Sequence, residues 1–292
     1  MSIYDELEAK RKNCLRHTLI AVSALGAGFL MSFLGLMLLG IPMIAFGFIY
    51  LGVAVGRKNK AFKKFYKDHV VKAVLEEFLD EVVFSPETGI DKRIIENTEM
   101  MSMGNTYHSN DYIRASYKDT EFYQADVCIQ NVTSNGKNTQ VVTYFKGRWF
   151  VFKFNKSFVY DMQIKERSFA YAKVRNGWFK PKESRFKKIE FEDDVFNKTF
   201  VTRAVNEQEA FYIVTPHFMQ DLMAFNDAVK GNILMCFVDN ELHLALNNDE
   251  DAFEPSLFKK LDPETGRRMI INDISVITEF VDKLKLDRRL FK

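Results

Sequence analysis

An uninterrupted stretch of 39 residues, from Thr18 to Gly56, contains no Asp, Glu, Lys, Arg or His. As a single straight helix it would be about 58 Å long, roughly twice the thickness of the hydrocarbon core of a bilayer. Two membrane spans fit this length better than one. Gly40, Ile41 and Pro42 predict the turn between them, because glycine relaxes the backbone and proline lacks the amide that continues a helix. We therefore predict spans over residues 18–38 and 41–56.

Basic residues flank the apolar stretch on both sides. Those before it are Lys10, Arg11, Lys12 and Arg16, and those after it are Arg57, Lys58, Lys60, Lys63, Lys64 and Lys67. The positive-inside rule places both flanks in the cytoplasm, as a two-span hairpin requires. The stretch is more than twice as long as the apolar core of a secretory signal peptide, so cleavage is not expected. The sequence thus predicts an inner-membrane hairpin with both termini cytoplasmic.

Small residues recur at spacing four within the hairpin. Ala24, Gly28 and Ser32 share one row in the first span, and Gly52 and Gly56 form a G-x-x-x-G pair in the second. Such rows let helix backbones approach closely, although glycine is also simply common in membrane helices, and the sequence leaves both readings open. Neither span carries an ionisable group that would indicate a proton or ion path. The hairpin is predicted to be an anchor.

Apolar residues at spacing four predict an amphipathic helix over residues 57–82, which should dock onto the domain that follows. These residues are Phe62, Tyr66, Val70, Val74 and Phe78. Residues 57–72 hold seven basic residues and one acid, whereas residues 73–292 have a net charge of −5. The basic strip can face anionic lipid, chiefly through Lys60, Lys63, Lys64 and Lys67, or can serve only to orient the hairpin during insertion.

The rest of the chain, residues 83–292, predicts a cytoplasmic α+β domain, after a cytoplasmic N-terminal segment (1–17), the hairpin (18–56) and the juxtamembrane helix (57–82). Runs rich in aromatic and β-branched residues predict an antiparallel sheet. The runs are 112–117, 122–130, 140–146, 149–154 and 169–174. The hairpin turns expected between strands are Asn135-Gly136, Lys146-Gly147 and Asn176-Gly177. Apolar groups on both faces of residues 149–154 indicate a strand covered on each side.

A second portion mixes helices with strands. Strands are predicted at 188–192, 200–204, 233–238 and 241–246, and helices at 90–101, 207–213 and 270–286. Thr215 and Pro216 predict the N-cap and first turn of a further helix, which places Phe218, Leu222 and Phe225 toward the core. Asp239-Asn240 predicts a two-residue hairpin turn. Because strands and helices do not alternate strictly, α+β is favoured over a doubly wound parallel sheet.

No motif specifies a chemical activity. The three cysteines (Cys14, Cys128, Cys236) and five histidines (His17, His69, His108, His217, His243) lack the spacings of zinc or redox sites, and no phosphate-binding or nucleophile-elbow motif occurs. Acid clusters at residues 190–194 and 249–254 lack the order of a calcium loop and are predicted to be solvated charge runs. We therefore assign no catalytic, cofactor or metal residue.

Other patterns are predicted to be incidental. The glycosylation-type sequences at Asn131, Asn155 and Asn197 would never meet the glycosylation machinery from the cytoplasm. Trp149, Trp178 and the many Phe are expected in the core rather than on a base-stacking platform, because the domain is acidic overall and no basic groove accompanies them. No nucleic-acid partner is expected; the expected partners are the lipid bilayer and an unidentified protein.

The combined pattern resembles one family, the bacterial membrane-anchored proteins of domain-of-unknown-function family 3137. The hairpin with its basic flanks carries part of the resemblance. The remaining segments are Asn110–Ile113 with Asp119–Phe122, Phe145–Phe150 with Lys156–Phe158, Phe191–Leu222, and Leu242–Ala245 with Phe253–Pro255. The resemblance covers most of the chain from about residue 10, and it implies no established activity. The sequence departs from the family pattern at Thr202–Val205, where Tyr-Ser and an acid are usual.

Two hypotheses of function follow. The leading one is a cytoplasmic interaction or scaffolding domain held at the inner membrane by the hairpin. The alternative is a membrane-tethered enzyme with a site assembled from scattered residues, including His108, Asp111 or His217. A deep pocket lined by converging polar groups would favour the enzyme, and an exposed interaction surface would favour the binding domain.

Overall fold

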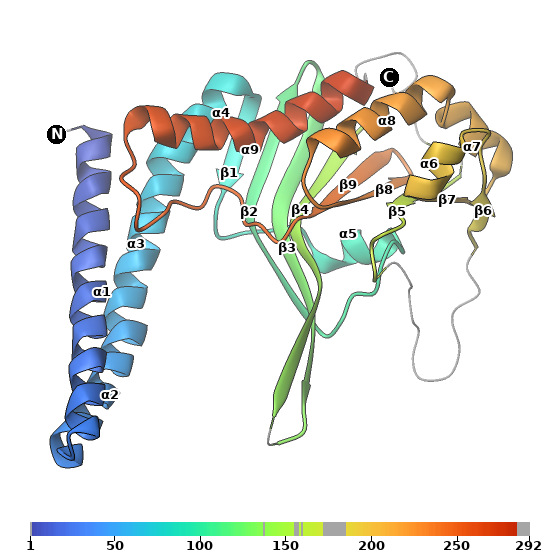
Figure 1. Ribbon diagram of the computed structural model, residues 1–292. Coiled ribbons are helices and arrows are strands. Elements are labelled where there is room, and N and C mark those ends of the chain that lie inside the picture. Colours follow the sequence, from blue (N-terminus) through green and yellow to red (C-terminus); the bar gives the residue numbers. More distant parts are fainter. Residues whose placement is uncertain (1, 137, 155–157, 159, 172–184, 285–292) are drawn as a thin grey trace. The chain divides into compact units, whose positions relative to one another are not determined.

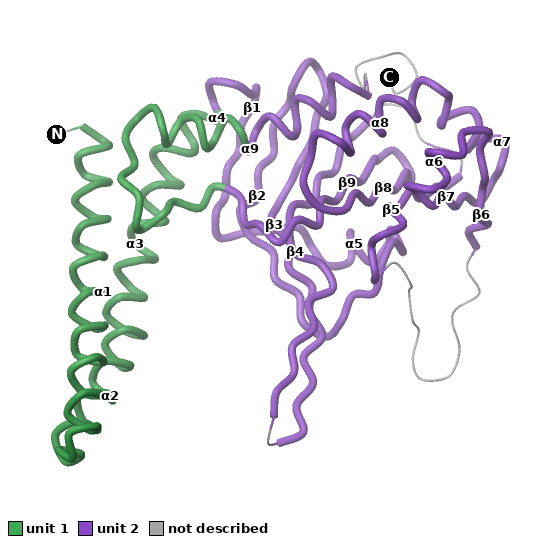
Figure 2. The backbone as a smooth tube through the Cα atoms, in the orientation of Figure 1, with its two compact units in different colours: residues 1–75, 253–272 green, residues 76–252, 273–292 purple. Residues whose placement is uncertain are grey.

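The computed structural model describes residues 2–136, 138–154, 158, 160–171 and 185–284. It divides into two compact units, residues 1–75 with 253–272 (unit 1) and residues 76–252 with 273–292 (unit 2), as Figure 2 shows. Two of the divisions fall inside helices α4 (Lys72–Phe78) and α9 (Pro263–Leu284), and the third falls between Ala252 and Phe253, outside any helix or strand. Trp178, the predicted turn at Asn176-Gly177, the sequence Asn155–Ser157 and the end of the predicted strand 169–174 lie outside the described residues.

Unit 1 contains two helices that are long and apolar enough to cross a membrane. The first is α1 (Ile3–Phe33), which begins with a capping box between Ser2 and Asp5. The second runs without interruption from Met37 to Phe78. Its parts are α2 (Met37–Tyr50), a π-helical turn (Leu51–Val55), α3 (Gly56–Tyr66), a second π-helical turn (Lys67–Val71) and α4. The apolar stretch and the amphipathic stretch are therefore one continuous helix.

The turn between the two apolar helices lies earlier in the chain than the predicted position. It occupies Leu34–Leu36, where Gly35 adopts a φ of +85°, a conformation that is strained for any residue with a side chain. Pro42 lies inside α2. The prediction of a turn at Gly40–Pro42 was wrong because proline already has a helical φ and costs the helix one hydrogen bond, which membrane helices commonly tolerate.

Small residues allow α1 and α2 to approach closely. A Cβ atom added to Gly28 would lie 2.9 Å from the carbonyl oxygen of Gly40, too close for any side chain. Ser32 stands in the same row and donates a hydrogen bond of 2.9 Å to the carbonyl of Gly28. Of the two readings that the sequence left open, the structure favours the packing role for this row. For Gly52 and Gly56 it shows no packing within the described chain, because an added Cβ at either position would meet no heavy atom within 4 Å.

Two glycine-to-alanine variants separate these roles. Gly40→Ala should force α1 and α2 apart and destabilise the helix pair by about 1–3 kcal/mol, since the new methyl group overlaps backbone atoms. Gly52→Ala should be neutral or stabilise by up to about 1 kcal/mol, because alanine is the better helix former and space is open there. Thermal unfolding of the two variants in the same detergent measures the difference. Equal melting temperatures would show that Gly28 and Gly40 do not control the approach.

A segment distant in sequence completes unit 1. Glu254 bonds both Lys63 and Lys67 of the long helix, the latter at 2.8 Å, and Arg11 of α1 donates to the carbonyl oxygen of Leu257 at 2.8 Å. Residues 253–272, which the sequence assigned to the domain 83–292, thus group with the helices. Of the predicted apolar stripe, Phe62, Tyr66, Val70 and Val74 are buried, whereas Phe78 is exposed and ends the helix before a strand begins at Asp80.

Unit 2 is built around one nine-stranded sheet in which every pairing is antiparallel, in the order β1-β2-β3-β4-β9-β8-β5-β7-β6. The strands are β1 (Asp80–Ser85), β2 (Thr106–Tyr117), β3 (Thr120–Ser134), β4 (Thr139–Lys153), β5 (Met162–Glu166), β6 (Lys187–Ile189), β7 (Phe200–Ala204), β8 (Asn232–Val238) and β9 (Glu241–Asn247). The helices of this unit besides α9 are α5 (Lys92–Asn97), α6 (Asp194–Thr199), α7 (Glu207–Ile213) and α8 (Pro216–Ala228). An α+β fold with an apolar helix pair is confirmed.

The central strands are covered on both faces, as Figure 1 shows. On one face, Phe280 of α9 packs against Phe152 of β4 and Phe225 of α8, each at a ring-centroid distance of 5.1 Å. On the other face, α5 and the residues after it cover a core that includes Trp149 and Val151. This double coverage confirms the expectation drawn from the apolar groups on both sides of residues 149–154.

Several local predictions are confirmed. Helix α7 has the predicted bounds, Thr215 caps α8, and Asn135-Gly136 and Asp239-Asn240 form hairpin turns. The turn at Lys146-Gly147 was wrong, because both residues lie inside one long strand, β4. A Cβ on Gly147 would overlap the carbonyl oxygen of Leu246, so this glycine allows close approach of strand β9 rather than a turn. Residues 169–171 form a turn instead of a strand.

Other element boundaries also differ from the predictions. Helix α5 is shorter than the predicted 90–101, and α9 begins seven residues before the predicted 270. The short strand β6 covers only part of 188–192, because Asp193 there caps α6, a helix that the sequence did not predict.

Candidate functional site

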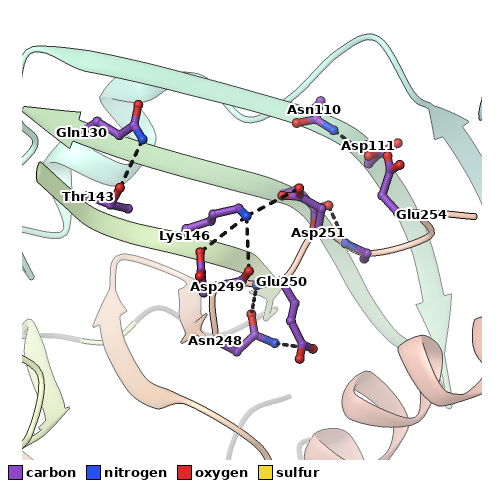
Figure 3. Close-up of polar contacts among 12 residues, drawn as sticks. Asn110, Asp111, Gln130, Thr143, Lys146, Asn248, Asp249, Glu250, Asp251 and Glu254 are labelled. Atoms are coloured by element: carbon purple, nitrogen blue, oxygen red, sulfur yellow. Dashed lines mark hydrogen bonds and ion pairs between the residues drawn. The ribbon is translucent and has the colours of Figure 1, made fainter. Parts of the chain in front are cut away.

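A group of polar side chains, most of them buried, lies in the middle of the sheet on the face that α9 covers. Asp126 of β3 lies directly opposite Arg148 of β4, and Asn110 of β2 lies opposite Asp126 on the other side. Asp111 sits beside them in a β-bulge, where its φ is +58°. Asp111, Asp126 and Arg148 are all less than 10% exposed. Figure 3 shows Asn110 donating to the Asp111 carboxylate, a hydrogen bond of 2.6 Å.

The surroundings of Asp126 favour the protonated form of its carboxyl. Burial and, to a smaller extent, the neighbouring Asp111 carboxylate raise the pKa of its carboxyl, whereas Arg148 and a backbone amide lower it, and together they bring the pKa to about 8. That amide belongs to Ala252, whose N–H donates to Asp126 Oδ2 at 2.7 Å. At neutral pH the carboxyl is therefore mostly neutral. Its structural effect is to fix the last residue of this segment of unit 2, before the chain enters residues 253–272.

The guanidinium of Arg148 is paired with Asp273 of α9 rather than with Asp126. Its Nη1 donates to the carbonyl oxygen of Asp273 at 2.5 Å, and its Nη2 lies 3.6 Å from the Asp273 carboxylate. The guanidinium also lies 5.8 Å from the centre of the Phe150 ring. This group links β4 to the part of α9 that belongs to unit 2.

Two residues before Arg148 on β4, Lys146 contacts the loop after β9. Its ammonium lies 3.4 Å from Asp249 Oδ1 and 3.8 Å from Asp251 Oδ2, as drawn in Figure 3. These acids keep the pKa of Lys146 raised against the opposing effect of desolvation. Asp249, Glu250 and Asp251 are exposed, as predicted for a solvated run, but Glu254 is not, because it bonds Lys63 and Lys67 within unit 1.

These contacts indicate a structural role for the buried polar side chains rather than a catalytic one. The carboxyls that have unusual surroundings are enclosed, and no group of three His, Cys, Asp or Glu side chains among the described residues could hold a metal ion. The residues proposed for the enzyme alternative have unlike environments. Asp111 is buried on β2, His108 is exposed on the same strand, and His217 is exposed on α8, 3.5 Å from Asp221.

The raised pKa of Asp126 gives a pH-dependent prediction. Its pKa in the unfolded chain is near 3.9 and in the folded chain about 8, so unfolding releases a proton between these values. The stability that this carboxyl contributes is complete below about pH 4 and is lost as the pH rises toward 8. Asp126→Asn keeps an acceptor for Ala252 and removes the titration. We expect urea unfolding of this variant to lose much less stability between pH 5 and 8.

The control is Asp249→Asn, which alters an exposed carboxyl in the same region. It should leave the pH dependence of the parent protein almost unchanged. A parent profile as flat as that of Asp126→Asn would contradict a raised pKa.

The opposite face of the sheet contains a second set of buried polar groups that the sequence did not reveal. Lys165 donates to the carbonyl of Met100 at 2.9 Å, and Gln163 donates to the carbonyl of Thr98 at 2.6 Å. Burial lowers the pKa of Lys165 to about 8, with nearby Arg203 adding to the effect. These side chains satisfy the backbone of the irregular segment after α5, a role that leaves no periodic signal in the sequence.

His243 is also fully buried. Its Nδ1 accepts from the Trp149 indole at 3.1 Å, and its Nε2 lies 3.4 Å from Glu241. Glu241 in turn accepts from the Tyr123 hydroxyl at 3.3 Å. Hydrogen bonding to His243 lowers the pKa of Glu241 in spite of its burial. The chain of bonds connects three strands across one face.

A different feature reaches away from the core. β3 and β4 remain paired as far as Ser134 and Thr139, but β2 begins to pair with β3 only at Gln130, and β9 begins to pair with β4 only at Gly147. Residues 131–136 and 138–144 therefore project from the sheet as a two-stranded ribbon, which we call the arm (Figure 1). A bulge at Tyr144, whose ring stacks on Tyr171 at 4.6 Å, marks its base.

The two edges of the arm differ. On the β3 edge, the Asn105 side chain takes the place of a neighbouring strand, because it accepts from the amide of Val132 at 2.8 Å and donates to its carbonyl at 2.7 Å. On the β4 edge, no strand of the described chain pairs with Thr139–Phe145. This open edge reads Thr-Gln-Val-Val-Thr-Tyr-Phe and has no charge, glycine or proline. Such segments pair readily with another strand.

These observations describe an α+β sheet unit joined to a pair of apolar helices. Residues 143–286, just under half of the chain, match the model of a family described as "Protein of unknown function (DUF3137)", so the chain is similar to that family over these residues. The resemblance inferred from Phe145–Phe158, Phe191–Leu222 and Leu242–Pro255 thus falls within the matched residues. The segments at the hairpin and at Asn110–Phe122 precede them.

Among curated proteins, none matches the chain. Among solved structures, the chain is similar to the crystal structure of the mycobacterial trehalose monomycolate transport factor A, TtfA. The two are 6% identical and have a TM-score of 0.35, with 73% of this chain and 93% of that chain covered. We draw no functional argument from a likeness at that level.

Proposed function

We propose that this protein is an interaction protein anchored in the inner membrane, with the sheet unit in the cytoplasm receiving a protein partner. The open β4 edge of the arm is the observation that carries the proposal. From Thr139 to Phe145, β4 pairs with β3 on one side and with no strand among the described residues on the other. A two-stranded ribbon standing alone is only marginally stable in water. Addition of a partner strand would supply backbone hydrogen bonds and stabilise it.

The composition of the arm supports the same role. Natural proteins protect exposed edges with charges, prolines or bulges, and here the β4 edge carries none of these between Thr139 and Thr143. Val141 is 51% exposed, so an apolar group is available as well. An extended segment that alternates small apolar and polar residues, without a charge in its centre, is the chemistry that fits this edge.

Adding charges to the open edge should weaken binding of the partner. In Gln140→Lys/Val141→Lys, two exposed side chains become cationic, and a partner strand would have to desolvate them or avoid them. We expect cross-linking from a photoreactive residue at position 143, in cells of the native host, to fall at least about fivefold, equivalent to about 1 kcal/mol.

The matched control is Thr133→Lys/Ser134→Lys, which places the same charges on the β3 strand, whose edge Asn105 already occupies. It should retain most of the cross-linking. Equal loss in both variants would indicate a general effect of charge, and equal retention would refute strand addition at β4. Thermal unfolding of both variants should match the parent, because all four side chains are exposed.

The topology is supported by the basic residues on both sides of the apolar helices and follows the positive-inside rule. Reporters fused before Ser2 and after Lys292 should both behave as cytoplasmic, with green fluorescent protein active and alkaline phosphatase inactive. A phosphatase placed in the turn at Gly35 should be active, because only this region reaches the other side. Phosphatase activity at the C-terminus would overturn the hairpin topology.

A further inference from the structure

The first helix contains a groove that the anchor role alone does not explain. It is an open depression of about 720 Å³ along α1 and α2, within the size range of small-molecule sites. Its lining includes Ser23 and Ala27 of α1 and Met43 and Phe46 of α2. All of its residues belong to unit 1.

The groove has an apolar end and a cationic end. Lys12, Arg16, Ile20 and Ala24 follow one another at spacing four, so they form a single row along α1. Lys12 and Arg16 stand at the end nearer the N-terminus, and every lining residue beyond them is uncharged. Lys12 lies 3.7 Å from Glu8, whereas Arg16 has no ionic or hydrogen-bond partner among the residues that the structure describes. One cation is thus available for an anion.

The length of the groove matches one leaflet of a bilayer. From Lys12 to Ala27 the helix rises 15 residues, which is about 22 Å. Half of a bilayer, including the headgroup region, measures about 20–22 Å. The cations would then lie at headgroup depth and the apolar part would lie in the hydrocarbon of the same leaflet. A phosphate near Arg16 and an acyl chain over Ser23 and Ala27 satisfy both ends at once.

We propose that this groove binds one molecule of an anionic phospholipid from the leaflet on the basic side. The proposal rests on the membrane anchoring proposed above and adds a stoichiometric lipid site to it. Arg16, with Lys12, holds the phosphate, and the acyl chain fills the space between α1 and α2. The bidentate geometry of a guanidinium suits a phosphate, while lysine adds charge.

This site differs from the basic strip that the sequence indicated. Of the four lysines assigned there to anionic lipid, Lys63 and Lys67 are bonded to Glu254. Arg57 and Lys64 remain exposed on α3, outside the groove. They provide a matched control, because their substitution removes the same charge from the other basic flank, which the proposed hairpin places on the same side of the membrane.

Native mass spectrometry of the full chain, released from detergent with added lipid, tests the charged end. We expect one phosphatidylglycerol molecule to bind about tenfold more tightly than phosphatidylcholine with the same acyl chains. Lys12→Gln/Arg16→Gln should abolish this preference, and Arg57→Gln/Lys64→Gln should keep it. Loss of the preference in both double variants, or in neither, would overturn the site.

The apolar end needs a separate variant. Ala27→Phe adds a ring at a residue that lines the groove, whereas Gly26→Phe adds the same ring at the adjacent position, which does not line it and where an added Cβ meets no atom within 4 Å. We expect Ala27→Phe to lose the bound lipid of either type and Gly26→Phe to retain it. Equal retention by both would refute an acyl chain in the groove. A lipid-free dimer of the parent protein, dissociated by Ala27→Phe, would assign the groove to a second copy.

Failure of the anchor is distinguishable from failure of the lipid site. Alkaline extraction of native membranes reports whether the parent chain is integral. A chain that resists extraction yet shows no lipid preference would refute only the groove. A chain that is extracted would refute the anchoring itself.

Discussion

The pairing of β3 with β4 is the constraint on which the rest of unit 2 depends. These strands share thirteen cross-strand partners, from Phe122↔Phe152 to Ser134↔Thr139. Because side chains alternate between faces, this register places Asp126 and Arg148 side by side beneath α9 and Trp149 on the other face. Both strands also extend beyond the residues that pair with β2 and β9, so no strand in the described part of the chain pairs with either side of the arm. A slip of one residue would reverse all of these positions together.

Double coverage explains why polar groups are buried in this sheet. When helices cover both faces, a polar residue on a central strand cannot reach water and must be satisfied by the chain itself. Asp126 is mostly protonated and accepts a hydrogen bond from the Ala252 amide, and Arg148 donates to the carbonyl oxygen of Asp273. Gln124, on the same face as Asp126, has no hydrogen-bond partner for either carboxamide atom among the described residues. Burying each of these polar groups costs stability. The contacts of Asp126 and Arg148 offset this cost by fixing the loop at Ala252 and helix α9.

The sequence predicted those features that local chemistry controls. Thr215 and Pro216 specify the start of α8, and Asp239-Asn240 a tight hairpin, because capping and turn residues act within four positions. The buried cluster was not predictable, since Asp126 and Asp273 are 147 residues apart in sequence and carry no shared motif. Gly147 shows the same limit. In the sequence this glycine predicts a turn, but the structure requires glycine because the carbonyl oxygen of Leu246 on another strand leaves no room for a Cβ atom. Likewise, the sequence predicts that Glu254 is solvated, because only the fold brings Lys63 and Lys67 next to it.

Unit 1 follows different rules, and the proposed bilayer accounts for the difference. Phe33 and Leu38 near the turn are 87% and 90% exposed, which in water would create an unfavourable apolar surface. In lipid the same exposure costs nothing, while helix packing has to rely on close contact at Gly28 and Gly40 rather than on apolar burial. The helix from Met37 to Phe78 then changes from apolar to basic at Arg57 without a break. In the proposed bilayer, the basic residues from Arg57 onward would set the depth of this helix, and within unit 1 the same helix is tied by Lys63 and Lys67 to Glu254.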